Sequence, residues 1–565
     1  MNTCEVPLTM ELKKPTIRDL LERSFLNFRS LPSIAFAGET PISYEELESR
    51  IALLSYRLID NGICPGDRVA ILGSNSPHWV QAYLALTMTG MVAVPILPGF
   101  PEESVHHIVR ETGAAAVFID DKYRHMVEEA ALDPLHTIIT LEDLSFKKIR
   151  KVPVNKTFAG WLKQHSSAPD TMQPLPRPEP DHLAVIIYTS GTTGHSKGVM
   201  LSHGNIAWDV IYGIRKFPID QRDRFLSILP LSHAFEATGG MLCALATGVS
   251  IYYMKGMPTP AKLLESMKTV GPTGVLTVPL VMDKIYRKQI LPGIQKSALT
   301  AKLYRYRFFR KQLHRIAGKK LVSSLGGHLR FFMFGGAALN EDVEIFLRDA
   351  GIQYSTGYGM TETSPIMTIN PFGHVRIGSC GQPIPGIEMK IDNPDPVTGE
   401  GEIMVHGPIV MQGYYNNPDE TAAILTKDGW LRTGDLGCFD SEDYLYIKGR
   451  IKNVIIGPSG ENIYPEIIEQ LYLKSSLIQE ILVTMQQGKL VAMVYPDIDF
   501  MEREYGLTDM TASEAARRKL ALLEEARHEL NEALPAFMRI NRIIESPEPF
   551  EKTPTNKIKR YLYEK

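Results

Sequence analysis

The sequence predicts an α/β protein with a large N-terminal region of two βα-layered subdomains, a β-rich barrel-like subdomain and a small α+β domain at the C-terminus. Strand-like and helical patterns alternate through residues 1–120, as in the βαβ units of a mostly parallel sheet. Residues 376–448 carry short β-type runs broken by Gly and Pro, which favours a small barrel or a distorted sheet. Short strands surround helices after Arg450, so we expect an N-terminal domain over 1–449 and a C-terminal domain over 450–565.

The first 120 residues give clear secondary-structure signals. Ser43 and Glu46 have the spacing of a capping box, and the apolar stripe after them predicts a helix that ends at Asn61-Gly62. Further helices are expected to begin near Pro77 and Glu102. The strand-like runs that alternate with these helices are 69–72, 92–96 and 115–119. This βαβαβ order predicts parallel pairing of the strands.

Later strands end in polar or glycine-rich residues. The run 225–229 leads into Pro230-Leu-Ser-His233, and the run 331–334 leads into Gly335-Gly-Ala-Ala338. In open α/β sheets, ligands bind at the carboxyl ends of the strands. We therefore expect a site at this edge of the sheet. Residues 150–182 are rich in Pro, Lys and Ser and are predicted to be a surface linker.

The composition is that of an ordinary globular protein. The chain has 565 residues, of which 44% are hydrophobic and 22% charged, and its formal net charge of -3 gives no bulk attraction to nucleic acid. Its five cysteines are scattered without a C-x-x-C pair, which argues against a disulfide framework or a zinc site and favours a reducing compartment. The N-terminus lacks a signal-peptide pattern, and the uncharged run 79–101 contains Gln, Gly and Pro. We expect a cytoplasmic protein without a transmembrane helix, either free or peripheral on the inner face of the membrane.

The loop at residues 188–198, YTSGTTGHSKG, follows the strand-like run 183–187. Its glycines let successive backbone N–H groups converge on an anion, its hydroxyls add donors, and Lys197 adds a mobile positive charge. The order differs from the P-loop G-x-x-x-x-G-K-[ST], because Lys197 here lies between Ser196 and Gly198. A flexible surface loop would need neither this density of hydroxyls nor a strand before it. The loop therefore predicts a polyphosphate site.

Four other segments carry groups that suit the rest of a nucleotide. Residues 357–362, GYGMTE, offer an aromatic face for a base and a carboxylate, Glu362, for a hard cation. Asp435 can accept both hydrogen bonds of a ribose diol, and Arg450 adds a fixed cation. Lys557 supplies a second lysine near the end of the sequence. Taken singly, each has a structural alternative, namely a core aromatic, a turn cap, a surface ion pair and a basic tail. Their joint occurrence indicates a site.

These five segments, in this order, resemble those of the adenylate-forming (AMP-binding) enzymes, which include acyl-CoA synthetases, luciferases and peptide-synthetase adenylation domains. The resemblance runs from about residue 16 to the C-terminus. It implies that Tyr358 stacks on adenine and that Thr189 and Glu362 hold Mg²⁺ through the phosphates. It also implies catalytic roles for Lys557, Lys197 and Glu362. The ATP-binding residues implied in the same way are Thr189, Ser190, Gly191, Thr192, Thr193, Gly194, Lys197, Gly335, Gly336, Ala337, Gly357, Tyr358, Gly359, Met360, Thr361, Asp435, Arg450 and Lys557.

The resemblance further implies ATP, Mg²⁺ and CoA as substrates and cofactors of a reaction in two halves. A carboxylate first attacks the α-phosphate, and Mg²⁺ and a lysine offset the repulsion between the two anions. A thiol then attacks the acyl-adenylate, so the C-terminal domain is expected to be mobile, with its hinge at Lys452. Gly460 and Glu461 lie just after this hinge and are expected on the CoA side.

The residues around His233 bear on the identity of the acid. The segments 229–236 (LPLSHAFE), 460–465 (GENIYP) and 553–558 (TPTNKI) resemble those of long-chain fatty acid–CoA ligases. His233 and Gly335 are the residues that we expect near the acyl group. No Asp follows His233 at the usual place of an amino-acid site, and no carrier domain follows Lys557, which argues against a peptide-synthetase domain.

Two departures from the family pattern leave the acyl chain length open. Ala237-Thr238 lie where some long-chain enzymes have a tryptophan gate, and Thr356 replaces a frequent glutamine. The expected function is a fatty acid–CoA ligase, with a medium-chain or aryl acid, or an acyl carrier protein as acceptor, as the alternatives. A luciferase-type oxygenase would share the first half-reaction. A catalytically silent nucleotide-binding protein would have little need to keep Lys557, Glu362 and Asp435 together.

Residues 284–340 contain no Asp or Glu, and the stretch 302–320 is strongly basic. Tyr304, Tyr306, Phe308 and Phe309 are interleaved with its basic side chains. An amphipathic helix with a solvated basic face accounts for this pattern. A contact with an anionic membrane surface is the sharper hypothesis. Nucleic acid would attract the same charge, but no reading module accompanies it. The basic residues are Lys302, Arg305, Arg307, Arg310, Lys311, Arg315, Lys319 and Lys320.

Overall fold

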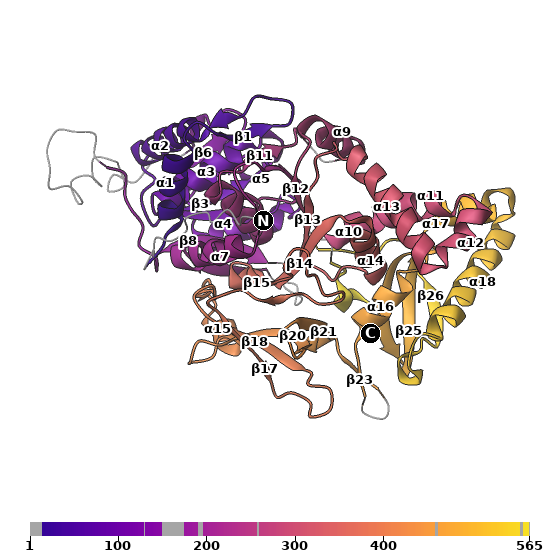
Figure 1. The fold of residues 1–565 in the computed structure, drawn as a ribbon. Coiled ribbons are helices and arrows are strands. Elements are labelled where there is room, and N and C mark those ends of the chain that lie inside the picture. The colour runs from indigo at the N-terminus through magenta and orange to yellow at the C-terminus, as the bar shows by residue number, and fades with distance from the viewer. Residues whose placement is uncertain are drawn as a thin grey trace.

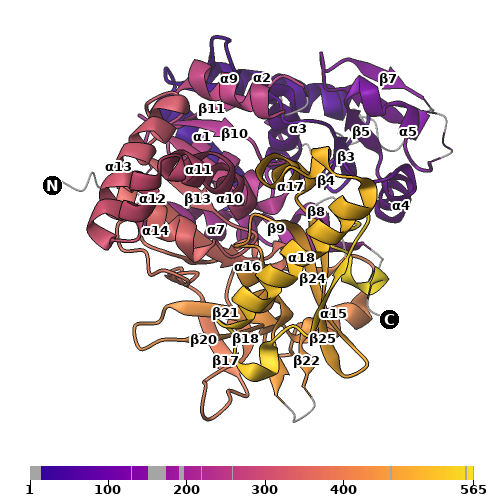
Figure 2. The ribbon, with the colours of Figure 1, turned by 90° about the vertical axis from the view of Figure 1, so that its right-hand side faces the viewer.

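The computed structural model describes two large sheets with helices between and around them, followed by smaller sheets (Figures 1 and 2). The predicted fold class is confirmed, with βα-layered subdomains, a β-rich subdomain and a final α+β part. The described residues are 14–128, 130, 132–149, 174–189, 196–217, 219–256, 259–457, 461–553 and 557–563.

The first sheet contains the predicted βαβαβ segment. Its order is β19-β9-β8-β4-β3-β5-β6-β7, and the strands from β8 to β6 in this order pair in parallel. The crossover helices are α3 (Pro77–Met88) and α4 (Glu102–Thr112). The strands are β3 (Arg68–Leu72), β4 (Val92–Ile96), β5 (Ala116–Ile119), β6 (Thr137–Thr140), β7 (Phe146–Lys148), β8 (Leu183–Thr189), β9 (Lys197–Ser202) and β19 (Gly413–Tyr414).

The second sheet brings the strands with polar ends side by side. Its order is β16-β15-β14-β13-β12-β10-β11-β1-β2, and the strands from β14 to β1 in this order pair in parallel. The carboxyl ends of β10, β12, β13 and β14 therefore share one edge. The strands are β1 (Pro32–Phe36), β2 (Ile42–Ser43), β10 (Arg224–Ser227), β11 (Ser250–Tyr253), β12 (Gly274–Thr277), β13 (Phe331–Phe334), β14 (Gln353–Gly359), β15 (Ile366–Ile369) and β16 (Gln382–Pro383).

Helix α3 lies between the two sheets and is buried on every side from Trp79 to Met88. A helix that is apolar all round belongs in a core, and the uncharged run 79–101 forms this helix and then β4. Among the described residues, no helix is long and apolar enough to cross a membrane.

Helix α2 (Tyr44–Asp60) begins where the sequence predicted, but its capping box is only half formed. The Ser43 Oγ accepts a hydrogen bond from the Glu46 N–H at 3.1 Å. The Glu46 carboxylate pairs with Arg50 at 2.6 Å instead of returning to the cap, because Arg50 lies one helical turn further along the exposed face.

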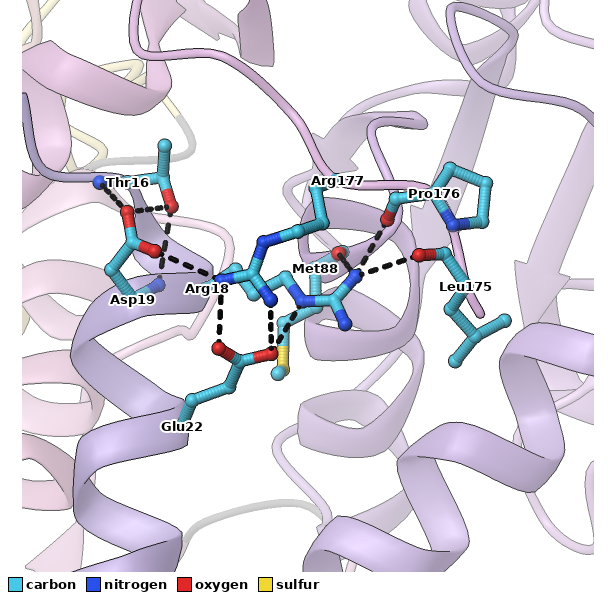
Figure 3. A network of polar contacts seen from close by, with 8 residues as sticks. All are labelled: Thr16, Arg18, Asp19, Glu22, Met88, Leu175, Pro176 and Arg177. Atoms are coloured by element: carbon cyan, nitrogen blue, oxygen red, sulfur yellow. Dashed lines mark hydrogen bonds and ion pairs between the residues drawn. The ribbon is translucent and has the colours of Figure 1, made fainter. Parts of the chain in front are cut away.

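The end of the predicted surface linker is fixed to helix α1 (Ile17–Phe28) (Figure 3). The Arg18 guanidinium donates to the carbonyls of Pro176 at 2.6 Å and Leu175 at 3.2 Å. Arg177 in turn donates to Glu22 at 2.7 Å. Residues 150–173 of the predicted linker lie outside the described residues. These contacts hold residues 175–177 against α1, so the chain is fixed in place shortly before β8 begins.

Other helices cover the faces of the two sheets. Those of the N-terminal region are α5 (His125–Glu128), α7 (His203–Lys216), α8 (Cys243–Ala246), α9 (Pro260–Val270), α10 (Pro279–Ile285), α11 (Leu291–Gln295), α12 (Ala298–Tyr304), α13 (Arg307–Ser324) and α14 (Glu341–Ala350). Helix α15 (Pro418–Ile424) follows β19.

The β-rich subdomain is an open, four-stranded antiparallel sheet. Its order is β17-β18-β20-β21, and within the described part of the chain this sheet does not close into a barrel. The distorted-sheet form of the prediction therefore holds, and the barrel-like form does not. The strands are β17 (Glu388–Asp392), β18 (Gly401–His406), β20 (Leu431–Phe439) and β21 (Leu445–Arg450).

The C-terminal part has its own sheet and its own apolar cluster. The sheet has the order β24-β25-β26. The predicted boundary at 449/450 stays a prediction; it falls between β21 and a short 3₁₀ turn, Ile451–Asn453. The elements are β22 (Ile455–Ile456), β23 (Asn462–Ile463), α16 (Pro465–Tyr472), β24 (Ile478–Gln486), β25 (Lys489–Pro496), α17 (Ile498–Tyr505), α18 (Ala512–Asn531) and β26 (Arg542–Glu545).

Candidate active site

A cavity opens at the carboxyl ends of β13 and β14, where the sequence predicted a site. The space within it is about 570 Å³, open solvent at its mouth included. Its polar lining includes His233, Tyr358 and Thr361. Its apolar lining includes Phe217, Phe235, Met333, Ile366 and Ile369. Gly357, Gly359 and Met360 also line it. The cavity therefore offers apolar walls together with a few polar groups.

A chain of polar contacts begins at Tyr358, which lines the cavity, and runs through Asp435 to Arg450. The Tyr358 hydroxyl donates to Asp435 Oδ2 at 2.7 Å, and Arg450 Nε lies 3.0 Å from Asp435 Oδ1. Asp435 and Arg450 are direct partners in the β20–β21 register, so the sheet itself holds this ion pair. Burial, and then the Asp435 charge, raises the pKa of Tyr358 well above its usual value. Tyr358 is therefore a neutral donor to a fixed carboxylate.

Glu362 lies just beyond β14, in a short 3₁₀ turn, and is buried. Its Oε1 accepts a hydrogen bond from the Tyr414 hydroxyl at 2.8 Å, and its carbonyl accepts from the Met411 N–H at 2.9 Å. These two contacts connect the turn to β19 of the first sheet. Tyr414 could not be identified from local sequence patterns, because its position depends on the pairing of β19 with β9.

The predicted polyphosphate loop joins β8 to β9 as an antiparallel connection. Thr189 and Lys197 are partners in the register, so they stand opposite each other at the base of the loop. Ser190, Gly191, Thr192, Thr193 and Gly194 lie outside the described residues. Lys197 Nζ forms an ion pair with Glu420 at the start of α15 and lies 5.1 Å from the centre of the Tyr414 ring. The hydrogen bond from Lys197 holds the pKa of Glu420 below its usual value. Glu420, like Tyr414, was not among the residues that the sequence indicated.

Gly335 and Gly336 follow β13 at the cavity, and glycine suits both positions. A Cβ on Gly335 would lie 3.0 Å from the Phe235 ring, a tight contact that only a shift of this ring would relieve, and Gly336 has a φ of +84°. Ala337 comes next and is exposed. The backbone can therefore approach a ligand closely at this strand end.

The turn after β10 brings His233 into the cavity wall. The Phe235 N–H donates to His233 Nδ1 at 3.3 Å. Burial, with a contribution from the positive charge of Lys557, lowers the pKa of His233 to about 4. The imidazole is therefore neutral at physiological pH.

Glu236, one helical turn after His233, is buried, and the sequence did not single it out as a site residue. Its Oε1 accepts from Ser227 Oγ at 2.6 Å, and Ser227 Oγ accepts from Asn75 Nδ2 at 2.9 Å. Its Oε2 has no hydrogen-bond partner among the described residues. Burial raises the pKa of Glu236 to about 8. This carboxyl is thus kept mostly protonated behind the cavity wall.

Lys557 reaches the same region from near the C-terminus. Its charge interacts with Arg450, Asp435 and Glu362, and it also acts on His233. Lys557 keeps contact with solvent, yet desolvation by the surrounding protein, followed by the Arg450 charge, lowers its pKa. Lys557 thus lies near residues that are more than a hundred positions away from it in the sequence.

Two other predicted residues, Lys452 and Glu461, do not line the cavity. Lys452 is exposed in the 3₁₀ turn after β21. Glu461 precedes β23, and Gly460 lies outside the described residues. Their expected roles as hinge and CoA side remain predictions.

Comparisons with known proteins agree with this geometry. A family profile described as "AMP-binding enzyme" matches residues 21–415. The chain is 30% identical over 568 residues to "Long-chain-fatty-acid--CoA ligase 1" of Homo sapiens, covering 92% of this chain and 80% of that protein. It is 29% identical over 567 residues to "Long chain acyl-CoA synthetase 7, peroxisomal" of Arabidopsis thaliana, covering 92% of this chain and 79% of that protein.

Solved structures with the same fold include ligases of smaller acids. An anthranilate CoA ligase in complex with anthranoyl-AMP superposes with a TM-score of 0.76 at 19% identity, covering 97% of this chain and 96% of that chain. An O-succinylbenzoate coenzyme A synthetase from Bacillus subtilis in complex with AMP superposes with a TM-score of 0.73 at 21% identity, covering 97% of this chain and 98% of that chain. The profile match covers well over half of the sequence, and the chain belongs to the family of AMP-binding enzymes.

Proposed function

We propose that this protein is an AMP-forming acid–thiol ligase that activates a long-chain fatty acid as an acyl-adenylate and then forms the CoA thioester. The observation that carries the proposal is the proximity of Lys557 to Glu362, Asp435 and Arg450, next to Tyr358 of the cavity wall. A nucleotide-binding protein without activity would need the pocket for the base and the ribose. It would not need a lysine from another part of the chain beside them.

The nucleotide would lie along the edge that joins the two sheets. In this arrangement Tyr358 stacks on adenine, and Asp435, held by Arg450, accepts from the ribose hydroxyls. The polyphosphate would lie against the loop between Thr189 and Lys197. Gly335 and Gly336 leave the backbone open to the adenosine and the acyl group.

The residues present fit a Mg²⁺ ion that arrives with ATP. Glu362 offers a buried carboxylate and Thr189 a hydroxyl, and such oxygen ligands are the ones that Mg²⁺ prefers. No cluster of three or more His, Cys, Asp or Glu side chains forms a metal site in the described part of the chain, as expected where phosphates supply the remaining ligands. Bound Mg²⁺ would neutralise phosphate charge. Glu362 is held for this by Tyr414.

In the first half-reaction a carboxylate oxygen bonds to the α-phosphorus, and the bond to the pyrophosphate oxygen breaks. The two reactants are both anions, so the positive charge of Lys557 between them lowers the barrier. Lys197 lies at the far end, where pyrophosphate leaves. In the second half-reaction the CoA thiol attacks the acyl carbonyl and AMP departs. Lys452 as hinge, and Gly460 with Glu461 on the CoA side, belong to this step.

The wall of the cavity supports an apolar acid. Phe217, Phe235 and Met333 line the cavity together with His233, which is neutral at physiological pH. In the proposed arrangement the carboxylate of the acid would lie near His233. The human and Arabidopsis relatives are named for long-chain acids, which supports a long chain here. The aromatic wall also suits a medium-chain or aryl acid, and an acyl carrier protein could replace CoA.

A panel of carboxylic acids from acetate to oleate, scored by AMP release with and without CoA, tests the proposal. We expect the greatest kcat/KM for long-chain acids, and AMP release that depends on CoA. Release that peaks with benzoate or octanoate would reassign the acid. Release that needs an acyl carrier protein would reassign the acceptor. Failure of ATP–pyrophosphate exchange with every acid would refute the enzyme itself.

A further inference from the structure

Helices α12 and α13 present a basic and aromatic surface at the edge of the molecule (Figure 2). Among its apolar side chains, Phe308 is 69% exposed, Leu299 66% and Tyr306 59%. Such exposure of large apolar groups in one place often marks a contact surface. We call this surface the basic-aromatic face. Its exposed members are Leu299, Lys302, Arg305, Tyr306, Arg307, Phe308, Phe309, Lys311, Arg315, Ile316, Lys319 and Lys320.

The helical period gathers these side chains on one side of α13. Phe308, Lys311, Arg315 and Lys319 follow one another at intervals of three or four residues and so form a stripe. The opposite side packs on α14, where a Cβ on Gly318 would lie only 2.5 Å from Ala350. Tyr304 belongs to the inner side, because its hydroxyl bonds to His314 at 2.9 Å. Of the four aromatics that are interleaved with the basic residues in the sequence, the face therefore carries three, Tyr306, Phe308 and Phe309.

The charge of the face is not balanced from within the structure. Residues 284–340 contain no acidic side chain. Among the described residues, no carboxylate lies within 4.0 Å of a basic group of the face. The nearest acidic helix, α14, uses Asp349 on the inner side, 3.0 Å from His314. The face is therefore a patch of uncompensated positive charge.

A shallow, open depression at the end of α13 extends the face toward α9. It is lined by Lys268, Lys319, Lys320, Ser323 and Ser324. Three ammonium groups and two hydroxyls, without an acid among them, are donors suited to a phosphate group. The face thus combines exposed aromatics at one end of α13 with a shallow depression lined by hydrogen-bond donors at the other.

We propose that the basic-aromatic face docks on the surface of an anionic lipid bilayer. The basic side chains would lie at the lipid headgroups, and Tyr306, Phe308 and Phe309 would enter the membrane–water interface. The depression that Lys268, Lys319 and Lys320 line would receive a lipid phosphate. A nucleic acid would also be attracted to the positive charge of the face, but its phosphate backbone offers no apolar surroundings in which phenylalanine or leucine side chains could be buried. The exposed apolar groups are what favours the bilayer.

Co-sedimentation of the full-length protein with vesicles tests this proposal. We expect the wild type to sediment with vesicles containing phosphatidylglycerol, to stay in solution with pure phosphatidylcholine, and to lose binding as salt is raised. The variant Lys311→Glu, Arg315→Glu, Lys319→Glu should bind on the order of 100-fold more weakly, since each basic residue near such a surface contributes about fivefold. Phe308→Ser with Phe309→Ser should also release the protein, at a salt concentration where the wild type stays bound.

Matched variants elsewhere on the surface serve as controls. Lys148→Glu, Lys427→Glu, Lys489→Glu reverses three exposed lysines away from the face, and Leu26→Ser, Leu53→Ser removes two exposed leucines. Both controls should sediment like the wild type, and thermal unfolding should show that every variant is folded. Equal sedimentation of the charge-reversed variant and the wild type would overturn the proposal. Binding to duplex DNA that matches vesicle binding and ignores the Phe308/Phe309 change would overturn it as well.

Discussion

The two ends of the candidate active site differ in how they treat charge. At the nucleotide end three charged groups have polar partners: Asp435 has Arg450, Lys197 has Glu420, and Glu362 accepts from Tyr414. At the acid end Glu236 is buried and His233 is half-buried. Neither has an ion-pair partner among the described residues, and their pKa values shift toward the neutral forms.

This difference fits the two proposed substrates. A polyanion is best held by groups fixed in advance through ion pairs, because little reorganisation is then needed when it binds. An apolar acid is best received by a wall that carries no charge at neutral pH. Lys557 is the group that joins the two ends, since it acts on both Asp435 and His233.

Removing Lys557 should therefore have the largest effect. For Lys557→Ala we expect acid-dependent ATP–pyrophosphate exchange to fall by about 10²–10³-fold, the typical result of losing a charge-stabilising group. Thioester formation from a supplied acyl-adenylate should persist, because that step does not join two anions. Lys559→Ala is the matched control, since Lys559 pairs with Glu551 at 3.2 Å. Undiminished exchange in Lys557→Ala would refute its role.

The sequence predicted the members of the site better than their connections. Tyr358, Asp435 and Arg450 were each expected near a nucleotide, but their mutual contacts depend on the register of β20 with β21. Tyr414 and Glu420 were missed, because only the folding of β19 against β9 brings them to the polyphosphate loop. No local pattern marks them.

Burial was the other property that local sequence could not supply. Glu236 looks like an ordinary charged residue in LPLSHAFE, and its protonation follows from helices and strands far along the chain. Tyr304 looked like its exposed neighbours until α13 was placed against α14. The fold class, in contrast, followed from periodicity, because alternating strands and helices repeat a signal over many residues.

The acid end can be tested through the pH dependence of stability. The folded pKa of Glu236 is raised to about 8, so the folded state keeps a proton that the unfolded chain releases near its usual pKa of 4.5. The contribution of Glu236 is therefore fully present below about 4.5 and is lost as pH rises toward 8. Glu236→Gln, which mimics the protonated form, should match the wild type at low pH. Toward pH 8 it should exceed the wild type by a few kcal/mol, on the order given by the shift.

Urea unfolding of both proteins across this pH range measures the difference. The exposed Glu388→Gln on β17 is the control and should track the wild type throughout. A constant difference between Glu236→Gln and the wild type at all pH values would show that Glu236 is ionised when folded. The contrast between the two ends of the site would then be wrong.

The nucleotide end can be tested at Asp435. In Asp435→Ala, Tyr358 and Arg450 both lose their partner, and the ribose loses its acceptor. Hydrogen bonds to a charged group contribute about 1.5–3 kcal/mol, so kcat/KM for ATP should fall by about 10- to 100-fold, with a smaller change for the acid. Asp440→Ala removes a carboxylate that pairs with Arg376 in the same sheet and should leave the KM for ATP unchanged. An equal loss in both variants would indicate a general disturbance of the sheet.

The smallest expected effect concerns the pair between Lys197 and Glu420. Glu420 is about half exposed, and such an ion pair contributes only about 0.2–1 kcal/mol. In Glu420→Gln the ammonium group loses the carboxylate that fixes it, so the KM for ATP should rise by up to about fivefold, and most at low ionic strength. Asp419→Asn, an exposed neighbour, should have no such effect. A lowered KM in Glu420→Gln would mean that Glu420 competes with the phosphates for Lys197, and the pair would then not prepare the nucleotide end for its ligand.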